Sequence, residues 1–181
     1  MYELPKSLEI DGIFYGIRSD FRAVLDIIAA LNDTELTEYE KIFVTLKILY
    51  VDFDKIVNIQ EAFKKAMWFI NCGDEEKGGA KRKLMDWEQD FKIIAAPVNR
   101  VLGYECRSCE YLHWWTFIGA YYEIGECTFS NVVNIRNKKQ KGKRLEKWEE
   151  EFYRENRNMI DLKQKVTSEE QEIINNIMGI M

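Results

Sequence analysis

The sequence has few of the residues that interrupt helices and few of those that carry out acid–base chemistry. It contains only two prolines, ten glycines and one histidine among 181 residues. Scarce proline and glycine leave long runs of helix-forming residues, which argues against a sandwich or barrel of many short strands. General acid–base catalysis would also need carboxylates patterned into an apolar stripe, and none stand out. We expect a mainly helical chain that is not an enzyme, has no catalytic residues and needs no cofactor.

Targeting signals are also missing from the sequence. The N-terminal region lacks a basic start followed by an apolar run, and no stretch approaches the roughly 18 apolar residues that span a membrane. The net charge of −5 gives no general attraction to nucleic acid or to anionic lipid. We expect a cytoplasmic protein whose four cysteines are reduced thiols and whose partner is neither a membrane nor a nucleic acid.

The chain does contain ample apolar material. It is 46% hydrophobic and 13% aromatic, enough for one well-formed core. We therefore predict a single domain over residues 1–181 with about six to eight helices. Its expected parts are an N-terminal β-hairpin, a first helical part, an exposed linker and a second helical part, at residues 1–18, 19–73, 74–85 and 86–181.

Short-range patterns locate the individual elements. Alternating apolar and polar residues flank the pair Asp11-Gly12, whose tolerance of positive φ suits a tight hairpin turn. Four helices with apolar stripes follow predicted N-caps at Ser19, Thr37, Asn58 and Asp86. Further helices are predicted at 111–122, where the chain is apolar on nearly all sides, at 129–135, at 145–166 and at 168–178.

The strongest suggestion of a metal site is the pair Cys106 and Cys109, with His113 four residues further on. Two thiolates and an imidazole at this spacing could converge on zinc. A closed structural site needs a fourth ligand, which only the isolated Cys72 or Cys127 could supply. We therefore predict ordinary buried or loop thiols and no bound metal.

The segment 136–144 is the best candidate for contact with nucleic acid. Its clustered cations could release counterions from a phosphate backbone. It has no interleaved aromatic side chains, and the acidic residues Glu146, Glu149, Glu150 and Glu151 follow and can pair with it. A solvated face that balances its own charge is the preferred interpretation.

Large aromatic side chains are abundant, with five tryptophans, nine tyrosines and ten phenylalanines. In the segment 111–122 they lie on two sides of one predicted helix, and both sides cannot easily face one core. An exposed stripe here would bind a partner's helix or a second subunit, whereas in the alternative the flanking helices bury both faces. The predicted protein-binding residues are Trp114, Phe117, Tyr121, Ile173, Ile174, Ile177 and Met178.

Several short segments also occur in a specific order. They are Leu4-Pro5, the hairpin around Asp11-Gly12, Ser19-Asp20-Phe21-Arg22, Ala66-Met67-Trp68-Phe69-Ile70-Asn71-Cys72-Gly73, Asp86-Trp87-Glu88-Gln89-Asp90, Glu110-Tyr111-Leu112-His113-Trp114-Trp115-Thr116-Phe117, and Phe129-Ser130 before Ile135-Arg136. In this order the chain resembles the short bacteriophage proteins named gene product fifteen. The charged segment 74–83, Pro97 and the tail after about 155 depart from the pattern.

The resemblance implies a gene beside the tape measure gene of a long-tailed phage or prophage, a place typically occupied by tail assembly chaperones. Such a chaperone is expected to coat the apolar helices of the tape measure protein in the bacterial host cytoplasm and to help recruit the major tail tube protein. One alternative is a structural component retained in the virion tail. Another, less favoured, is a nucleic-acid-binding or zinc-dependent regulator. The residues leave open whether the chain forms a homo-oligomer.

Overall fold

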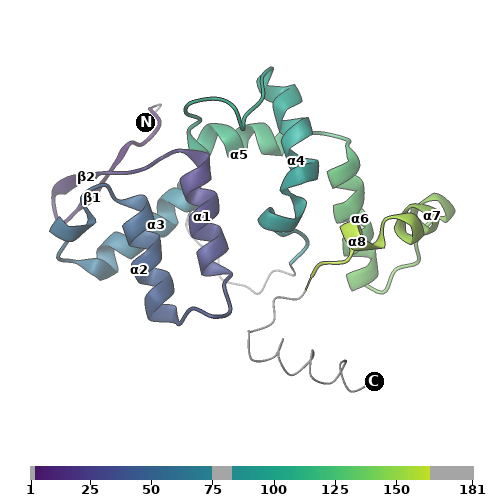
Figure 1. Ribbon diagram of the computed structural model, residues 1–181, viewed down its shortest axis with the longest axis horizontal. Helices are drawn as coiled ribbons and strands as arrows, with labels where there is room; N and C mark the ends of the chain where they lie inside the picture. The colour runs from purple at the N-terminus through teal and green to yellow at the C-terminus, as the bar shows by residue number, and fades with distance from the viewer. Residues whose placement is uncertain (1–2, 75–82, 164–181) are drawn as a thin grey trace.

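The computed structural model of the protein describes residues 3–74 and 83–163. Within these ranges it contains one two-stranded antiparallel sheet and eight α-helices (Figure 1). The elements are β1 (Ser7–Ile10), β2 (Ile13–Gly16), α1 (Phe21–Leu31), α2 (Glu38–Leu49), the 3-10 turn η1 (Phe53–Lys55), α3 (Ile59–Ile70), α4 (Trp87–Leu102), α5 (Trp114–Tyr122), α6 (Thr128–Gln140), α7 (Lys147–Glu155) and α8 (Arg157–Ile160). The predicted mainly helical fold with an N-terminal hairpin is confirmed.

The hairpin forms around the predicted turn. Asp11 and Gly12 have φ angles of 49° and 81°, the left-handed conformations that a two-residue turn requires. Ile10 therefore lies directly opposite Ile13, and this register places Leu8 and Ile10 on the buried face of β1.

Local caps begin most of the first helices as predicted. Thr37 forms a capping box with Glu40, and the side chains of Asn58 and Asp86 accept hydrogen bonds from main-chain N–H groups in the first turns of α3 and α4. The cap of α1 is Asp20 and not Ser19, because the Asp20 carboxylate accepts the main-chain N–H of Arg22 at 3.0 Å.

The large core lies where α1, α4 and α5 meet. The rings of Phe21 in α1 and Phe117 in α5 stack with centroids 4.6 Å apart, and the ring of Phe91 in α4 lies 6.5 Å from that of Phe21. This cluster continues through the hairpin, α2 and α3 at one end of the molecule (Figure 1). A smaller cluster of Val132, Ile135 and Ile160 joins α6 to α8 at the other end.

The central aromatic helix begins later than predicted. Tyr111 and Leu112 lie outside any helix, and α5 starts at Trp114 with His113 as its N-cap. The reason is tertiary, because the chain around His113 forms an antiparallel bridge with Asp20, just before α1. The Leu112 carbonyl accepts the N–H of Phe21 at 2.9 Å, and the N–H of Trp114 donates to the Ser19 carbonyl at 2.8 Å.

Two further helix predictions need correction. The helix expected at 129–135 continues to Gln140 as α6, and the long helix expected at 145–166 is divided into α7 and α8 at Asn156. The break turns the chain so that Ile160 is buried and the carbonyls of Met159 and Ile160 face Arg136 of α6. The helix predicted at 168–178 and most of the predicted linker lie outside the described residues.

Within residues 3–74 and 83–163, none of the helices combines the length and apolar character needed to cross a bilayer.

Candidate functional site

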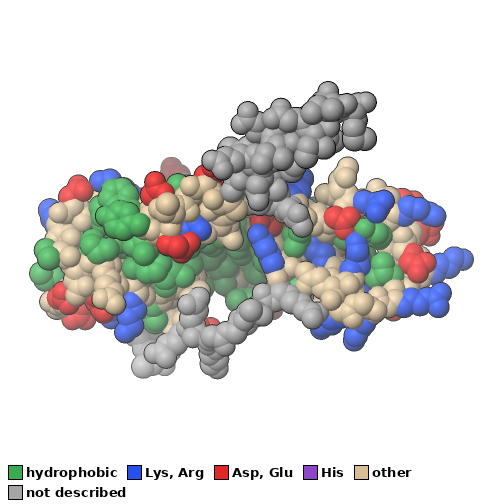
Figure 2. Space-filling view, turned by 90° about the horizontal axis from the view of Figure 1, so that it is seen from below, with side chains coloured by type: hydrophobic (Ala, Val, Ile, Leu, Met, Phe, Trp, Pro, Cys, Tyr) green, Lys and Arg blue, Asp and Glu red, His purple; other side chains and the backbone are tan. Residues whose placement is uncertain are grey.

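Large apolar side chains are exposed at the end of the molecule formed by the hairpin, α2 and the chain that follows α2. Figure 2 shows hydrophobic side chains gathered at this end, on the left of the view. Phe14 is 69% exposed and Val57 is 94% exposed, which is unusual for side chains of this kind. We call this region the hairpin surface, and its exposed members are Ile13, Phe14, Phe43, Val51 and Val57.

Specific contacts connect the parts of the hairpin surface. The Gly16 carbonyl accepts the Val51 N–H at 3.0 Å, and the Val51 side chain lies 3.8 Å from where a Cβ on Gly16 would stand. Phe14 lies two residues before Gly16 and thus on the same face of β2, so the Val51 side chain lies on the face of the hairpin that carries Phe14. At the turn, the Asn58 amide donates to the Asp11 carboxylate at 3.0 Å, which holds the chain beside Val57.

The hairpin surface is absent from the sequence predictions, although a signal for it existed. Ile13, Phe14 and Tyr15 are consecutive apolar residues in a strand, where successive side chains point to opposite faces. Only the face that carries Leu8 and Ile10 packs on the core. At least one apolar side chain of β2 must therefore point outward.

A groove of about 910 Å³ lies between β1 and α3. Phe63, Met67 and Trp68 form its helical wall, and Ser7 and Glu9 form part of its strand wall. The indole of Trp68 packs edge-on against Trp115 of α5, with ring centroids 5.5 Å apart. This contact anchors the helical wall to the core while leaving Trp68 37% exposed.

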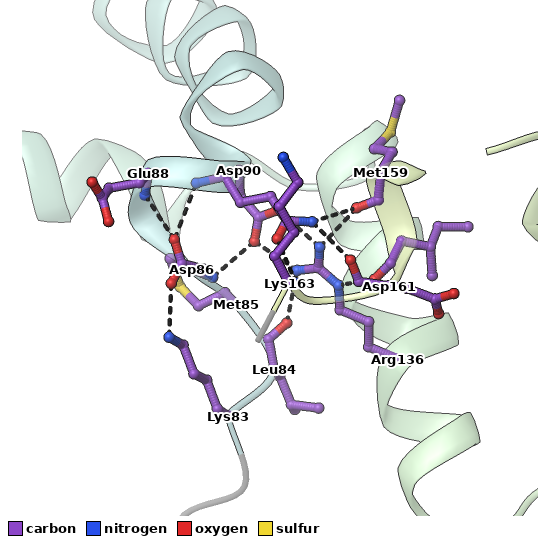
Figure 3. A network of polar contacts seen from close by, with 12 residues as sticks. Lys83, Leu84, Met85, Asp86, Glu88, Asp90, Arg136, Met159, Asp161 and Lys163 are labelled. Carbon is purple, nitrogen blue, oxygen red and sulfur yellow. Dashed lines mark hydrogen bonds and ion pairs between the residues drawn. The ribbon is translucent and has the colours of Figure 1, made fainter. Parts of the chain in front are cut away.

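The best-defined polar site is a buried ion pair between α4 and α6 (Figure 3). Arg136 donates to both carboxylate oxygens of Asp90, at 2.6 and 2.9 Å, and both side chains are nearly inaccessible to solvent. The guanidinium also donates to the carbonyls of Leu84, Met159 and Ile160, so all five of its N–H donors are used. This arrangement holds the chain before α4 and the turn at α8 against α6, which is a structural role.

The sequence carried a signal for this ion pair as well. Asp90 stands three residues after Trp87 and four before Ile94, on the buried stripe of α4. Arg136 stands four residues after Val132, on the buried stripe of α6. A charged residue at a buried stripe position predicts that its side chain has a buried partner, but it does not identify that partner.

The remaining cations of the segment 136–144 are partly paired within the chain. Lys138 contacts both carboxylate oxygens of the buried Glu149, at 2.7 and 2.8 Å, and Lys139 contacts Asp161 at 2.6 Å. The hydrogen bond to Glu149 raises the pKa of Lys138. Burial raises the pKa of Glu149 but the hydrogen bond from Lys138 lowers it, and the net shift is downward. The Lys138 pairing with Glu146 and Glu149 is of the kind that the sequence suggested.

His113 is engaged by the protein at both ring nitrogens. Its Nδ1 accepts the main-chain N–H of Trp115 at 3.0 Å, so its Nε2 carries the hydrogen that is donated to the Pro5 carbonyl at 3.0 Å. Burial lowers the pKa of His113, which favours this neutral form.

The two cysteines near His113 also have partners in the protein. The Cys109 thiol donates to the Cys106 carbonyl at 3.0 Å, and Arg22 donates to the Cys109 carbonyl at 2.6 Å. Burial raises the pKa of Cys106, which opposes the thiolate that a metal would need. In the described ranges no three His, Cys, Asp or Glu side chains gather as metal ligands would.

The expected binding stripe on α5 is corrected by the structure. Trp114 and Phe117 are 2% and 0% exposed, because α1, α4 and the end of α3 cover them, and the Trp114 indole donates to the Ile70 carbonyl at 2.8 Å. Tyr121 is half-buried against Trp87. The other predicted binding residues, Ile173, Ile174, Ile177 and Met178, lie outside the described residues.

The fold is that of a small, mainly helical protein with an N-terminal hairpin and an apolar end. The chain belongs to the Bacteriophage Gp15 protein family, whose family model matches residues 1–162. It is therefore a phage protein, in agreement with the resemblance seen in the sequence. Neither a curated protein nor a solved structure matches the chain.

Proposed function

We propose that this phage protein is a tail assembly chaperone without enzymatic activity, which binds the tape measure protein in the cytoplasm of the bacterial host. The observation that carries the proposal is the hairpin surface, where Phe14, Val51 and Val57 are all more than half exposed. Contact between these side chains and water is unfavourable, and burying them against an apolar partner lowers the free energy.

The chemistry of the surface suits the expected partner. Apolar helices of a tape measure protein need a partner that covers one apolar face and presents charge to solvent. The hairpin surface supplies the first property, and a net charge of −5 supplies the second. Aromatic members such as Phe14 and Phe43 provide large contact areas without demanding one fixed geometry.

Co-expression with the tape measure protein of the same phage genome tests the proposal. The wild-type chain should raise the amount of soluble tape measure protein and co-purify with it. The double variant Phe14→Ser/Val51→Ser should weaken the complex by at least about tenfold, which corresponds to about 1.4 kcal/mol. The matched control is Tyr122→Ser, which removes an aromatic side chain that is 75% exposed at the end of α5.

Two outcomes count against the proposal. Equal solubility of the tape measure protein with and without this chain, together with no co-purification, would remove it. Stoichiometric amounts of the chain in finished particles, measured by mass spectrometry, would instead identify a structural tail component. Parallel co-purification with the major tail tube protein tests the second expected partner.

A further inference from the structure

The outer edge of β1 has unpaired main-chain groups. In the two-residue hairpin, Ile10 and Leu8 form the hydrogen-bonded pairs with β2, and the 2.9 Å bond from the Ile17 N–H to the Lys6 carbonyl continues this alternation. The N–H and C=O groups of Ser7 and Glu9 must therefore point away from β2. In the described part of the chain, no other main-chain group pairs with them.

The corresponding edge of β2 is closed. The outward carbonyl of Gly16 accepts the N–H of Val51, and just beyond the strand the N–H of Arg18 donates to the Leu49 carbonyl at 2.7 Å. The hairpin therefore has one open edge, and Ser7 and Glu9 on that edge also line the groove between β1 and α3. An edge strand beside an apolar groove is the arrangement that accepts an added strand.

The walls of the groove indicate the kind of side chain that fits. Phe63, Met67 and Trp68 offer an apolar wall to one side of an added strand. On the same wall Lys65 pairs with Glu61 at 3.7 Å, whereas the exposed Lys64 forms no ion pair with the described residues. Glu9 and Asp74 also line the groove, but neither forms an ion pair with Lys64. An acidic side chain on the incoming segment would therefore complement Lys64.

We propose that this groove binds an extended segment of another protein, which adds to β1 as a third strand. The segment pairs with the main chain of Ser7 and Glu9, places alternate apolar side chains against α3, and directs an acidic residue at Lys64. A helix cannot occupy the groove in this way, because its main-chain groups are already bonded within the helix. A second copy of β1 is the competing occupant, and the concentration series below tests for it. The proposal is independent of the tape measure assignment.

Selection from a display library of random ten-residue peptides provides the probe, with the full wild-type chain as target. Selected peptides should alternate apolar residues and carry an acidic residue. Glu9→Pro removes an outward N–H that β2 does not use, and it should weaken binding at least tenfold. The matched control Glu9→Thr keeps that N–H. Its affinity for the peptide should stay within about twofold of the wild-type affinity, because the main chain and not the side chain of residue 9 makes the contact. Lys64→Glu should weaken binding several-fold.

Amide hydrogen exchange on the wild-type chain needs no variant and so cannot be confused with misfolding. A selected peptide should slow exchange at Ser7 and Glu9 and leave Leu8 and Ile10, which already donate to β2, unchanged. The proposal is overturned when no peptide is selected, or when binding leaves Ser7 and Glu9 exchanging as in the free chain. It is also overturned when the free chain protects these two amides as its concentration rises, since a second copy would then be the occupant.

Discussion

Asp90 of α4 and Arg136 of α6 form a two-point ion pair, with nitrogen–oxygen distances of 2.6 and 2.9 Å, that is sealed from solvent. The guanidinium simultaneously binds the carbonyls of Leu84, Met159 and Ile160. Two chain segments far apart in the sequence are thus held against α6 by one side chain. Removing both charges from water costs free energy when the pair forms. We therefore expect the pair to select this packing of α4, α6 and α8 more than to add net stability.

Removing the cation should therefore be severe. Arg136→Met leaves the buried Asp90 carboxylate without a countercharge, with only the Asp86 N–H still donating to it, and we expect a loss of about 3–5 kcal/mol in the free energy of unfolding. The measurement is urea denaturation followed by circular dichroism. The double variant Asp90→Asn/Arg136→Met should be less destabilised than Arg136→Met, because no buried charge is then left unpaired. Equal stability of Arg136→Met and wild type would contradict the burial of the pair.

Acidification should weaken the fold through His113. In the unfolded chain this group titrates near 6.5, and burial lowers its pKa in the folded chain. Between the lowered folded pKa and 6.5 the unfolded chain binds more protons, so the free energy of unfolding falls as the pH drops through this window. Above about 6.5 both states hold the neutral ring, and this contribution does not change with pH.

Urea titrations between about pH 7.5 and 5 measure the His113 effect. His113→Asn keeps a good N-cap for α5 but does not titrate, and it should flatten the upper part of this pH dependence. His113 is the only histidine in the chain. A variant with the same slope as wild type from pH 7 to 5.5 would rule out His113 as its source.

The cap of α1 can be identified by a pair of substitutions. Asp20→Ala removes the acceptor for the Arg22 N–H and for the Leu112 N–H, which donates to the carboxylate at 2.9 Å, and should cost about 1–3 kcal/mol. Ser19→Ala loses only the 2.7 Å hydrogen bond between the Ser19 and Tyr111 hydroxyls and should cost less. Thermal unfolding of both variants gives the comparison. A larger loss for Ser19→Ala would restore Ser19 as the cap.

Predictions that depend on neighbours in sequence agree with the structure. The turn at Asp11-Gly12 and the caps at Thr37, Asn58 and Asp86 each involve groups within four residues of one another. Their conformational preferences and hydrogen bonds do not need the rest of the chain. The same reasoning fails at Ser19 because the adjacent Asp20 has a second, distant partner in Leu112.

The candidate sites were less predictable because exposure is a property of the whole fold. An aromatic helix can be recognised from the sequence, but whether Trp114 faces solvent depends on α3, whose Ile70 carbonyl accepts its indole N–H. Likewise, a basic segment can be recognised, but Arg136 is withdrawn from it by Asp90, 46 residues away. The hairpin surface, with Phe14, Val51 and Val57, exposes large apolar side chains instead.

The sequence by itself determined the helical class, the hairpin turn, most of the early caps and the resemblance to a phage family, because these rest on composition and on short-range order. Only the tertiary structure decided where α5 begins and where α7 ends and α8 begins. It also decided that Phe14 and not Trp114 is exposed, and that β1 has an open edge. Each of these depends on which distant segment supplies a hydrogen-bond partner or covers an apolar face, and local preferences do not contain that information.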